Sequence, residues 1–319
     1  MQDATRDAKK LPCDAARAMD AEVAFVAEVA SNHARDLVRS LALVDAAAAA
    51  GFDAVKFQLF RVEELFAPEV LARSPAHRSR ATWELPESFV PRLAERARAR
   101  GIAFGCTPFH LAAVDVLAPH VDFLKIASYE LLWDDLLRAC ARSGRPVVLS
   151  TGMATLAEVE HAVAVLGAAG CRDLGLLHCV SLYPTPPAQA NLSAIGALRR
   201  LGAPLPQTRL RVGWSDHSAD PAVVLRAVHG HGASLVELHF DLDGAGAEFA
   251  PGHCWLPERA QETIRLVRTG LAADGDGVKR PAPGEADERA WRADPGDGLR
   301  PLRATRRTWL AAPRREDAA

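Results

Sequence analysis

The chain has 319 residues, enough for one large α/β domain or two small ones, with 49% hydrophobic and 24% charged residues. This balance is ordinary for a folded protein and argues against extensive disorder. A formal net charge of −2 provides no field to attract nucleic acid or an anionic membrane, and no apolar run is long enough to cross a bilayer. We therefore expect small-molecule ligands and neither a nucleic-acid nor a membrane partner.

Residues 1–21 mix acidic and basic side chains and lack the apolar core of a signal peptide, which predicts a flexible leader on a cytoplasmic protein. After them, β-rich runs and helical patterns alternate eight times along the chain. The predicted strands are 23–30, 53–60, 102–109, 123–128, 146–152, 174–180, 211–217 and 235–243. The predicted helices are 36–50, 88–100, 133–143, 155–168, 192–201, 220–231 and 256–270.

This alternation predicts an α/β fold, a (β/α)8 TIM barrel over residues 22–271. The alternative is an open doubly wound sheet, but no GxGxxG follows the first strand and the chain contains no GxxxxGK[ST]. Residues 61–85 form a long connection after the second strand and are a candidate lid. Residues 272–319, rich in Asp, Gly, Pro and Arg, are predicted to form an irregular C-terminal extension that packs on the barrel.

Polar side chains gather at the C-terminal ends of the predicted strands, where TIM barrels carry their active sites. They include Glu28, Lys56, Gln58, Thr107, Lys125, Ser128, Ser150, Ser181, Tyr183, Ser215, Asp216, His217, Glu237 and His239. A single Ser or Thr at such a position is more often a helix cap, but the whole set indicates a functional site. Two lysines among several hydroxyls suit a ligand that carries both phosphate and carboxylate.

Two histidines stand at the ends of neighbouring predicted strands. The rings of His217 and His239 can converge on one metal ion, and two imidazoles with oxygen ligands from substrate and water suit Mn²⁺, Co²⁺, Fe²⁺ or Zn²⁺. Asp216 is a candidate to orient a ligand or to bind the metal directly. Structural or surface roles are expected for His110, His161, His178 and His229.

Eight motifs, in order over roughly residues 22–260, resemble those of the N-acetylneuraminate (sialic acid) synthase family. They are AEVASNH (27–33), DAVKFQLF (53–60), TPF (107–109), LKIASYE (124–130), VLSTGMATLAEVE (148–160), LHCVSLYPTP (177–186), GWSDHS (213–218) and VELHFDLD (236–243). The resemblance implies a homodimeric transferase that joins phosphoenolpyruvate to the aldehyde of a hexosamine such as N-acetylmannosamine. It also implies a divalent metal, Mn²⁺ first, with Co²⁺, Mg²⁺, Fe²⁺ or Zn²⁺ as alternatives. The products would be a nonulosonic acid and phosphate.

Carried over by position, the resemblance implies His217 and His239 as metal ligands and Glu28 as the catalytic acid or base. It implies a phosphoenolpyruvate pocket of Lys56, Thr107, Lys125, Ser128, Ser150 and Ser215. It implies sugar contacts from Gln58, Tyr183 and Ser181. The metal would polarise the aldehyde oxygen, and Glu28 would position or deprotonate the water that adds at C2.

The chain departs from the family pattern in several places. Ser181 stands where many members carry Asn, and no glycine follows His33. AEFAPGHCW (247–255) replaces the usual loop after the eighth strand, so His253 or Glu248 is a candidate to contact the sugar.

The C-terminal region departs most. Typical relatives add a small antifreeze-like domain whose arginine reaches the partner's site, whereas this chain has DPGDGLRPLRATRRTW (294–309). We therefore expect a member without that domain, in which Arg300 or Arg303 is a candidate replacement for the arginine.

Other functions remain as alternatives. A deoxy-octulosonate or deoxy-heptulosonate phosphate synthase would take a phosphorylated sugar and need a basic cluster, which Arg61, Arg73, Arg78 and Arg80 of the long loop offer; the motif order argues against it. A non-catalytic barrel serving as a binding subunit would be expected to lose its site residues first, yet they are present. A pyruvate aldolase would not need so many phosphate-type contacts.

Overall fold

The computed structural model describes residues 21–201 and 207–311. The predicted leader lies outside the described residues, apart from Ala21. The chain divides into two compact units, of which the first ends at Leu271 and the second begins at Ala272.

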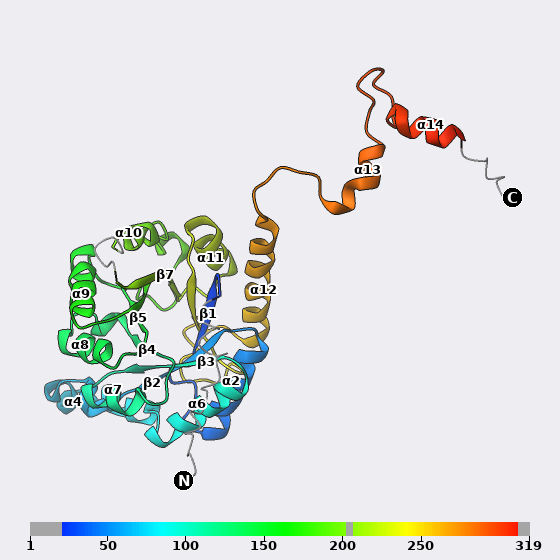
Figure 1. Cartoon of the computed structure of the whole chain (residues 1–319). Coiled ribbons are helices and arrows are strands. Elements are labelled where there is room, and N and C mark those ends of the chain that lie inside the picture. The colour runs from blue at the N-terminus through cyan, green and yellow to red at the C-terminus, as the bar shows by residue number, and fades with distance from the viewer. Residues whose placement is uncertain (1–20, 202–206, 312–319) are drawn as a thin grey trace, which may run out of the picture. The chain divides into compact units, whose positions relative to one another are not determined.

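The first unit is built on eight parallel strands that close into a barrel in chain order, which confirms the predicted TIM-barrel fold (Figure 1). The strands are β1 (Ala24–Glu28), β2 (Ala54–Leu59), β3 (Ala103–Pro108), β4 (Phe123–Ile126), β5 (Val147–Ser150), β6 (Asp173–Cys179), β7 (Arg209–Asp216) and β8 (Leu235–His239). Each lies within a few residues of a predicted strand, because β-rich runs of this length between helical patterns are a strong local signal.

Helices follow the strands around the barrel. They are α2 (Leu37–Ala49), α6 (Val90–Ala99), α7 (Leu111–Leu117), α8 (Asp134–Arg142), α9 (Leu156–Ala168), α10 (Ala194–Arg200), α11 (Pro221–Leu225) and α12 (Pro257–Asp274). Helix α7 was not predicted, since its seven residues are too few to show a periodic pattern. His110 caps it by accepting a hydrogen bond from the backbone N of Ala113 (3.2 Å). No helix in the described ranges has the length and apolar character needed to span a bilayer.

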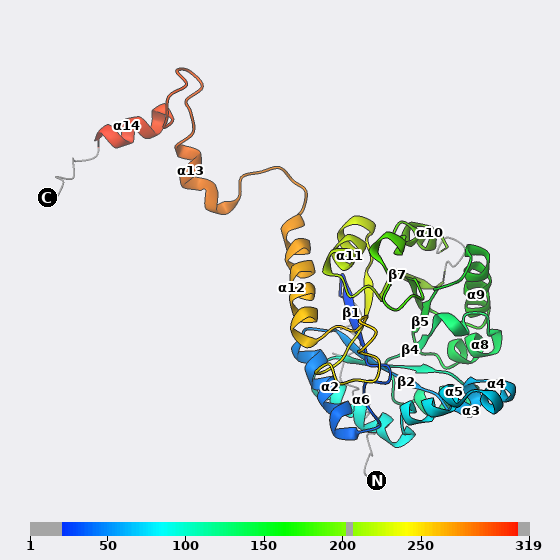
Figure 2. The same ribbon diagram turned by 180° about the vertical axis from the view of Figure 1, so that it is seen from behind.

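The long connection after β2 is more ordered than the predicted loop. It contains α3 (Val62–Leu65), α4 (Pro68–Arg73), α5 (Pro75–Arg78) and a 3₁₀ turn over Ser79–Trp83, which lie together in the view from behind (Figure 2). Each element is a turn or two long and buries few residues, so no amphipathic period marks it in the sequence.

The second unit is not irregular throughout. It contains α13 (Ala286–Ala290) and α14 (Arg303–Ala311), preceded by a 3₁₀ turn over Pro283–Glu285. The predicted packing of this segment on the barrel stays a prediction, as do the roles suggested for Arg300 and Arg303.

Side chains that point into the barrel form two layers, an apolar floor and a polar layer above it. The floor consists of Ala24, Val26, Ala54, Ala103, Phe123, Val148, Leu177 and Leu235. Side chains two residues further along a strand point to the same face, so Glu28, Lys56 and Lys125 lie directly above the floor. The strand register places Glu28 between Lys56 on β2 and His239 on β8. The barrel therefore assembles the polar layer from several strands.

Gly213 on β7 lies directly against the backbone of Leu235 on β8. A Cβ built there would lie 1.8 Å from the backbone oxygen of Leu235, which cannot rotate away. We expect Gly213→Ala to lower the free energy of unfolding by about 1–3 kcal/mol or more, seen as a lower Tm. Gly196→Ala is the matched control, because nothing lies within 4 Å of that Cβ position in α10 and Ala favours a helix. An unchanged Tm in Gly213→Ala would contradict this close packing.

Candidate active site

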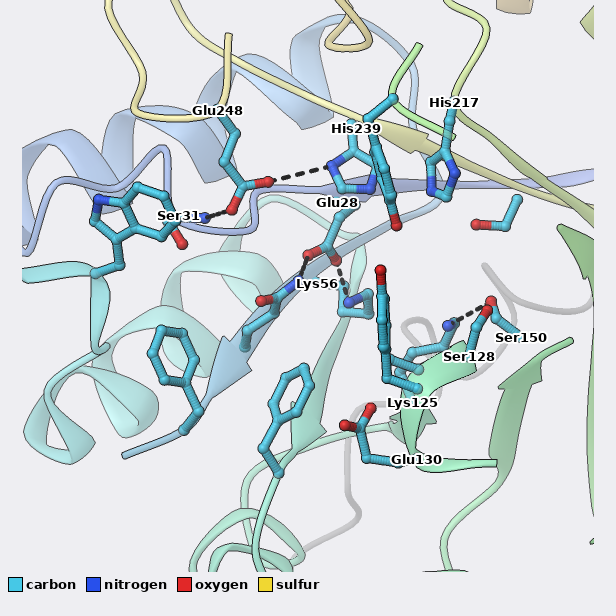
Figure 3. Close-up of a pocket in the computed structure, with 18 of the residues that line it drawn as sticks. Glu28, Ser31, Lys56, Lys125, Ser128, Glu130, Ser150, His217, His239 and Glu248 are labelled. Carbon is cyan, nitrogen blue, oxygen red and sulfur yellow. Dashed lines mark hydrogen bonds and ion pairs between the residues drawn. The ribbon is translucent and has the colours of Figure 1, made fainter. Parts of the chain in front are cut away.

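A cavity of about 720 Å³ lies at the C-terminal ends of the strands (Figure 3). It is lined by ten of the twelve predicted site residues: Glu28, Lys56, Gln58, Lys125, Ser128, Ser150, Tyr183, Ser215, His217 and His239. The other two, Thr107 and Ser181, are not among the lining residues. Thr107 is fully buried and accepts a hydrogen bond from Lys56 Nζ (2.7 Å). Ser181 has a buried hydroxyl without a partner in the described part of the chain.

Glu28 is the buried carboxylate at the centre of the polar layer. It forms an ion pair with Lys56 and accepts a hydrogen bond from Gln58 Nε2 (2.7 Å). Burial raises the pKa of Glu28 to about 7, although the Lys56 ammonium opposes the shift. Burial also disfavours the charged form of Lys56, but Glu28 and Glu237 outweigh it and raise the pKa of Lys56. The site thus holds a permanent cation beside a carboxylate that can exchange a proton near neutral pH.

Lys125 lies at the end of β4 in a second charged group. Its ammonium donates to Ser150 Oγ (2.6 Å) and lies 3.8 Å from Glu237 Oε2. Ser215 donates to the other oxygen of Glu237 (3.2 Å). Burial lowers the pKa of Lys125, and the charge of Glu237 opposes this shift. Sequence reasoning gave Glu237 no role, although its position two residues before His239 on one strand face indicates that it points inward.

Glu130 is a further acid that lines the cavity and was not predicted. One of its carboxylate oxygens is buried without a partner among the described residues, and burial raises its pKa to about 7. It follows Ser128 in the LKIASYE motif, so the motif itself contained a signal for it.

The turn after β5 brings hydroxyl groups close together. Ser128 Oγ accepts a hydrogen bond from the backbone N of Gly152 (2.9 Å). A Cβ on Gly152 would lie 2.4 Å from Ser181 Oγ and 2.9 Å from Ser128 Oγ. Only glycine therefore allows both hydroxyls to approach this turn.

His217 and His239 converge as predicted, with ring centroids 5.0 Å apart. The Nδ1 atom of His217 lies 2.7 Å from the carbonyl oxygen of Val180, and Nδ1 of His239 lies 3.7 Å from Glu248 Oε2. Burial lowers the pKa of His217 to about 4 and that of His239 well below its usual value, so both rings are neutral. The contact of His217 Nδ1 with the Val180 carbonyl leaves Nε2 of that ring available as a ligand, whereas Nδ1 of His239 has no hydrogen-bond partner among the described residues. This pair fits a divalent metal ion.

A third imidazole, His253, lies beside them with its ring centroid 4.7 Å from that of His239. Neither of its ring nitrogens has a hydrogen-bond partner among the described residues, although both are buried. His239, His253 and Cys254 offer ligand atoms within 4.8 Å of one another. Cys254 Sγ already donates to the carbonyl oxygen of Glu248 (3.3 Å), whereas neither nitrogen of His253 makes a hydrogen bond with the described residues. Of these two neighbours, His253 is the better additional donor.

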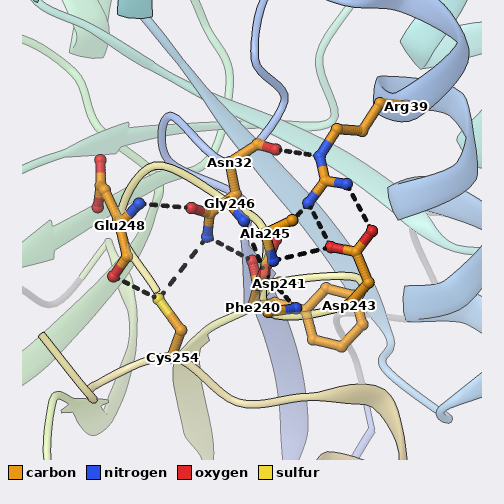
Figure 4. Close-up of polar contacts among 10 residues, drawn as sticks. Asn32, Arg39, Phe240, Asp241, Asp243, Ala245, Gly246, Glu248 and Cys254 are labelled. Atoms are coloured by element: carbon orange, nitrogen blue, oxygen red, sulfur yellow. Dashed lines mark hydrogen bonds and ion pairs between the residues drawn. The ribbon is translucent and has the colours of Figure 1, made fainter. Parts of the chain in front are cut away.

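The loop after β8 is held by a polar network (Figure 4). Asp241 accepts hydrogen bonds from the backbone N atoms of Gly244 (2.8 Å) and Gly246 (3.0 Å). Asn32 Oδ1 accepts from the backbone N of Glu248 (2.8 Å), and Arg39 pairs with Asp241 (2.7 Å). These contacts fix the loop that carries Glu248 and His253 into the cavity, where both residues suggested as sugar contacts form part of the lining.

Asp216 does not line the cavity, contrary to the role suggested for it beside the metal. Its carboxylate accepts hydrogen bonds from Trp214 Nε1 (3.0 Å), Trp255 Nε1 (3.1 Å) and the backbone N of Ala219 (2.9 Å). It therefore anchors the end of β7 to the loop after β8.

The connection after β2 forms one wall of the cavity. Its lining side chains are Leu65, Phe66, His77, Arg80 and Trp83. The sequence marked this segment as a candidate lid, but it did not indicate which of the side chains face inward.

Comparison with known proteins identifies the family to which the chain is similar. The NeuB family model matches residues 43–279. The chain is 37% identical over 266 residues to an uncharacterized protein of Methanocaldococcus jannaschii, covering 82% of the chain and 75% of that protein. It is 32% identical over 276 residues to N,N'-diacetyllegionaminic acid synthase of Campylobacter jejuni. This match covers 82% of the chain and 80% of that protein. The crystal structure of N-acetylneuraminic acid (sialic acid) synthetase from Leptospira borgpetersenii matches with a TM-score of 0.72 and 32% identity, covering 83% of this chain and 90% of that one.

Fold, site and relatives together define an enzyme, a carbon–carbon bond-forming transferase of the sialic acid synthase type. The chain belongs to the NeuB family. The resemblance seen in the sequence motifs is therefore confirmed.

Proposed function

We propose that this enzyme condenses phosphoenolpyruvate with the open-chain aldehyde of N-acetylmannosamine or a related hexosamine. The products are a nonulosonic (sialic-acid-like) 2-keto-3-deoxy acid and phosphate. One observation carries the proposal: a single cavity joins two buried lysines, a buried carboxylate and two neutral imidazoles. The register of β1 with β2 and β8 places the carboxylate, Glu28, between the cation and the imidazole.

The lysine end of the cavity suits phosphoenolpyruvate. Lys56 and Lys125 are held by the hydroxyls of Thr107 and Ser150, so their ammonium groups are oriented before a ligand arrives. Ser128 and Ser215 add hydroxyl donors on the same side. These groups bind the phosphate and carboxylate and hold C3 toward the second substrate, a positioning role.

The imidazole end suits the aldehyde. His217 and His239 would hold a divalent ion, with Mn²⁺ preferred and Co²⁺, Mg²⁺, Fe²⁺ or Zn²⁺ as alternatives. Such an ion supplies Lewis acidity toward the aldehyde oxygen. The Tyr183 ring lies 4.1 Å from that of His217, and Gln58 holds Glu28, so both would contact the sugar at this end. Ser181, which does not line the cavity, would act through the turn at Gly152.

The reaction forms a carbon–carbon bond at C3 and a carbon–oxygen bond from water to C2, and it breaks the bond between C2 and the phosphate oxygen. C3 of phosphoenolpyruvate bonds to the aldehyde carbon, and the aldehyde oxygen takes up a proton. Glu28 removes one proton from the water that adds at C2, which balances the proton taken up by the aldehyde oxygen. The hydroxyl at C2 then becomes the keto group, its proton leaving with the phosphate.

Phosphate release from phosphoenolpyruvate with Mn²⁺, measured against a panel of aldehyde sugars, tests the proposal. The panel contains N-acetylmannosamine, its 6-phosphate, diacetamido-trideoxyhexoses, arabinose 5-phosphate and erythrose 4-phosphate, and mass spectrometry identifies the product. Sugar-dependent release that a chelator abolishes is expected. The proposal would be contradicted if the folded protein bound neither metal nor phosphoenolpyruvate. The resemblance also supports a cytoplasmic homodimer. Light scattering would test the oligomeric state by measuring the molar mass in solution.

Glu248→Gln is expected to weaken metal binding by about 10–100-fold, because its carboxylate lies 3.7 Å from His239 Nδ1 and would orient that ring once the ion is bound. Titration calorimetry with Mn²⁺ measures the affinity. Glu130→Gln is the matched control, since it removes another carboxylate of the same cavity. Equal Mn²⁺ affinity in Glu248→Gln and the wild type would show that Glu248 does not orient the ring.

A further inference from the structure

The wall formed by the connection after β2 places one guanidinium at the cavity. Arg80 is the only arginine lining this cavity in residues 21–201 and 207–311. Its Cζ lies 5.5 Å from the ring centroid of Phe66 and 5.4 Å from that of Trp83. Contact with two aromatic faces holds the group in place without using its N–H donors.

The N–H donors of Arg80 make no hydrogen bond with the described residues, whereas those of Arg61 and Arg78 on the same connection do. Arg61 pairs with Glu64 (3.2 Å) and Glu87 (2.5 Å), and Arg78 donates to the backbone oxygen of Leu71. The Arg80 guanidinium makes no hydrogen bond or ion pair with any residue that the structure describes. An oriented cation whose N–H donors make no hydrogen bond with the described residues therefore faces the cavity, where its charge also acts on Glu248.

His77 adds a second donor beside it. Its ring centroid lies 4.7 Å from that of Phe66, and it also lines the cavity. Ser74 Oγ accepts from the backbone N of His77 (3.4 Å) and lies 2.7 Å from its Nδ1, to which it can donate. The ring proton then lies on Nε2, which is left to bind a ligand.

This pair is distinct from the lysines at the other end of the cavity. Lys56 and Lys125 are each 2% exposed in the inner layer of the barrel, while Arg80 is an exposed residue of the surrounding connection. A sugar whose aldehyde lies at His217 and His239 extends from the buried layer toward the mouth. In this binding mode the far end of the sugar would face Arg80 on the exposed connection rather than the buried lysines.

We propose that Arg80, together with His77, binds an anionic group at the end of the acceptor sugar away from the aldehyde. The acceptor is accordingly an aldehyde sugar that carries a phosphate or a carboxylate. The inference rests on the proposed function, which places the aldehyde at the imidazoles. A planar guanidinium offers two parallel N–H donors, a geometry that matches two oxygens of either group.

Acceptors that differ only in charge test this subsite: N-acetylmannosamine, its 6-phosphate and the corresponding 6-carboxylate. We expect one anionic sugar to exceed the neutral one in kcat/KM. Arg80→Gln should raise KM for that sugar about 10–100-fold and leave KM for phosphoenolpyruvate unchanged. Arg80→Lys, which keeps the positive charge but loses the two parallel N–H donors, should recover part of the affinity. Arg73→Gln is the matched control, because Arg73 is exposed on α4 and does not line the cavity.

The two anionic sugars distinguish a phosphate from a carboxylate ligand. A wild-type preference for the neutral sugar, unchanged in Arg80→Gln, overturns the subsite while the proposed function stands. If no sugar supports phosphate release, the proposed function fails. The subsite is then tested separately by measuring the binding of the two anionic sugars by calorimetry. A tenfold or greater loss of affinity in Arg80→Gln then supports it, and equal affinity overturns it.

Discussion

Glu28→Gln is expected to lower kcat by about 10²–10⁴-fold while phosphoenolpyruvate still binds, since an amide of the same shape cannot accept a proton from water. Steady-state phosphate release measures kcat, and circular dichroism checks the fold. Glu22→Gln is the control, because Glu22 is an exposed carboxylate just before the same strand. Wild-type turnover in Glu28→Gln would remove Glu28 from the proposed chemistry.

The pH dependence provides a second test of the same residue. Burial raises the pKa of Glu28 to about 7, so the ionised fraction decreases as the pH falls below neutrality. The base form is the active one in the proposed reaction, and kcat/KM for phosphoenolpyruvate should therefore fall on the acid side. The residual activity of Glu28→Gln should lack this fall. If the variant showed an acid-side fall in kcat/KM of the same size and midpoint, that fall would belong to a group other than Glu28.

His217→Ala and His239→Ala are each expected to lose the bound divalent ion and, with it, phosphate release. Both side chains are buried and neutral, so removing either leaves one imidazole where two converge. Metal affinity should fall by more than about 100-fold, beyond the loss caused by removing an orienting partner. Metal content after dialysis, measured by mass spectrometry, reports this independently of activity.

His161→Ala is the matched control for the histidine variants. His161 is exposed on α9 and pairs with Asp134 (2.8 Å), far from the cavity lining. Retention of metal in both His217→Ala and His239→Ala, together with its loss in His253→Ala, would move the centre to the third imidazole.

The polar layer of the barrel could be predicted because strand geometry is periodic. A parallel barrel brings the C-terminal ends of all its strands to one rim, and alternate residues share a face. Glu28, Lys56, Lys125 and His239 therefore needed only correct strand positions to be placed together. Alternation of strand and helix likewise sufficed for the fold.

Loops and short elements do not follow such a period. Helix α7 and the turns between Val62 and Trp83 are too short to show one, and their side-chain directions depend on contacts with distant residues. The sequence offered four arginines in the long connection; the structure pairs two and places Arg80 at the cavity.

By itself, the sequence determined the TIM barrel, the rim at which the polar side chains gather, and a set of twelve site residues, of which ten line the cavity. Only the tertiary structure decided that Asp216 anchors β7, that Thr107 supports Lys56, and that Glu237 pairs with Lys125. It also placed Glu248 opposite His239 and brought Arg80 to the mouth. The physical reason is that strand periodicity specifies which face a residue occupies, whereas pairing among buried charges depends on distances between segments far apart in the chain.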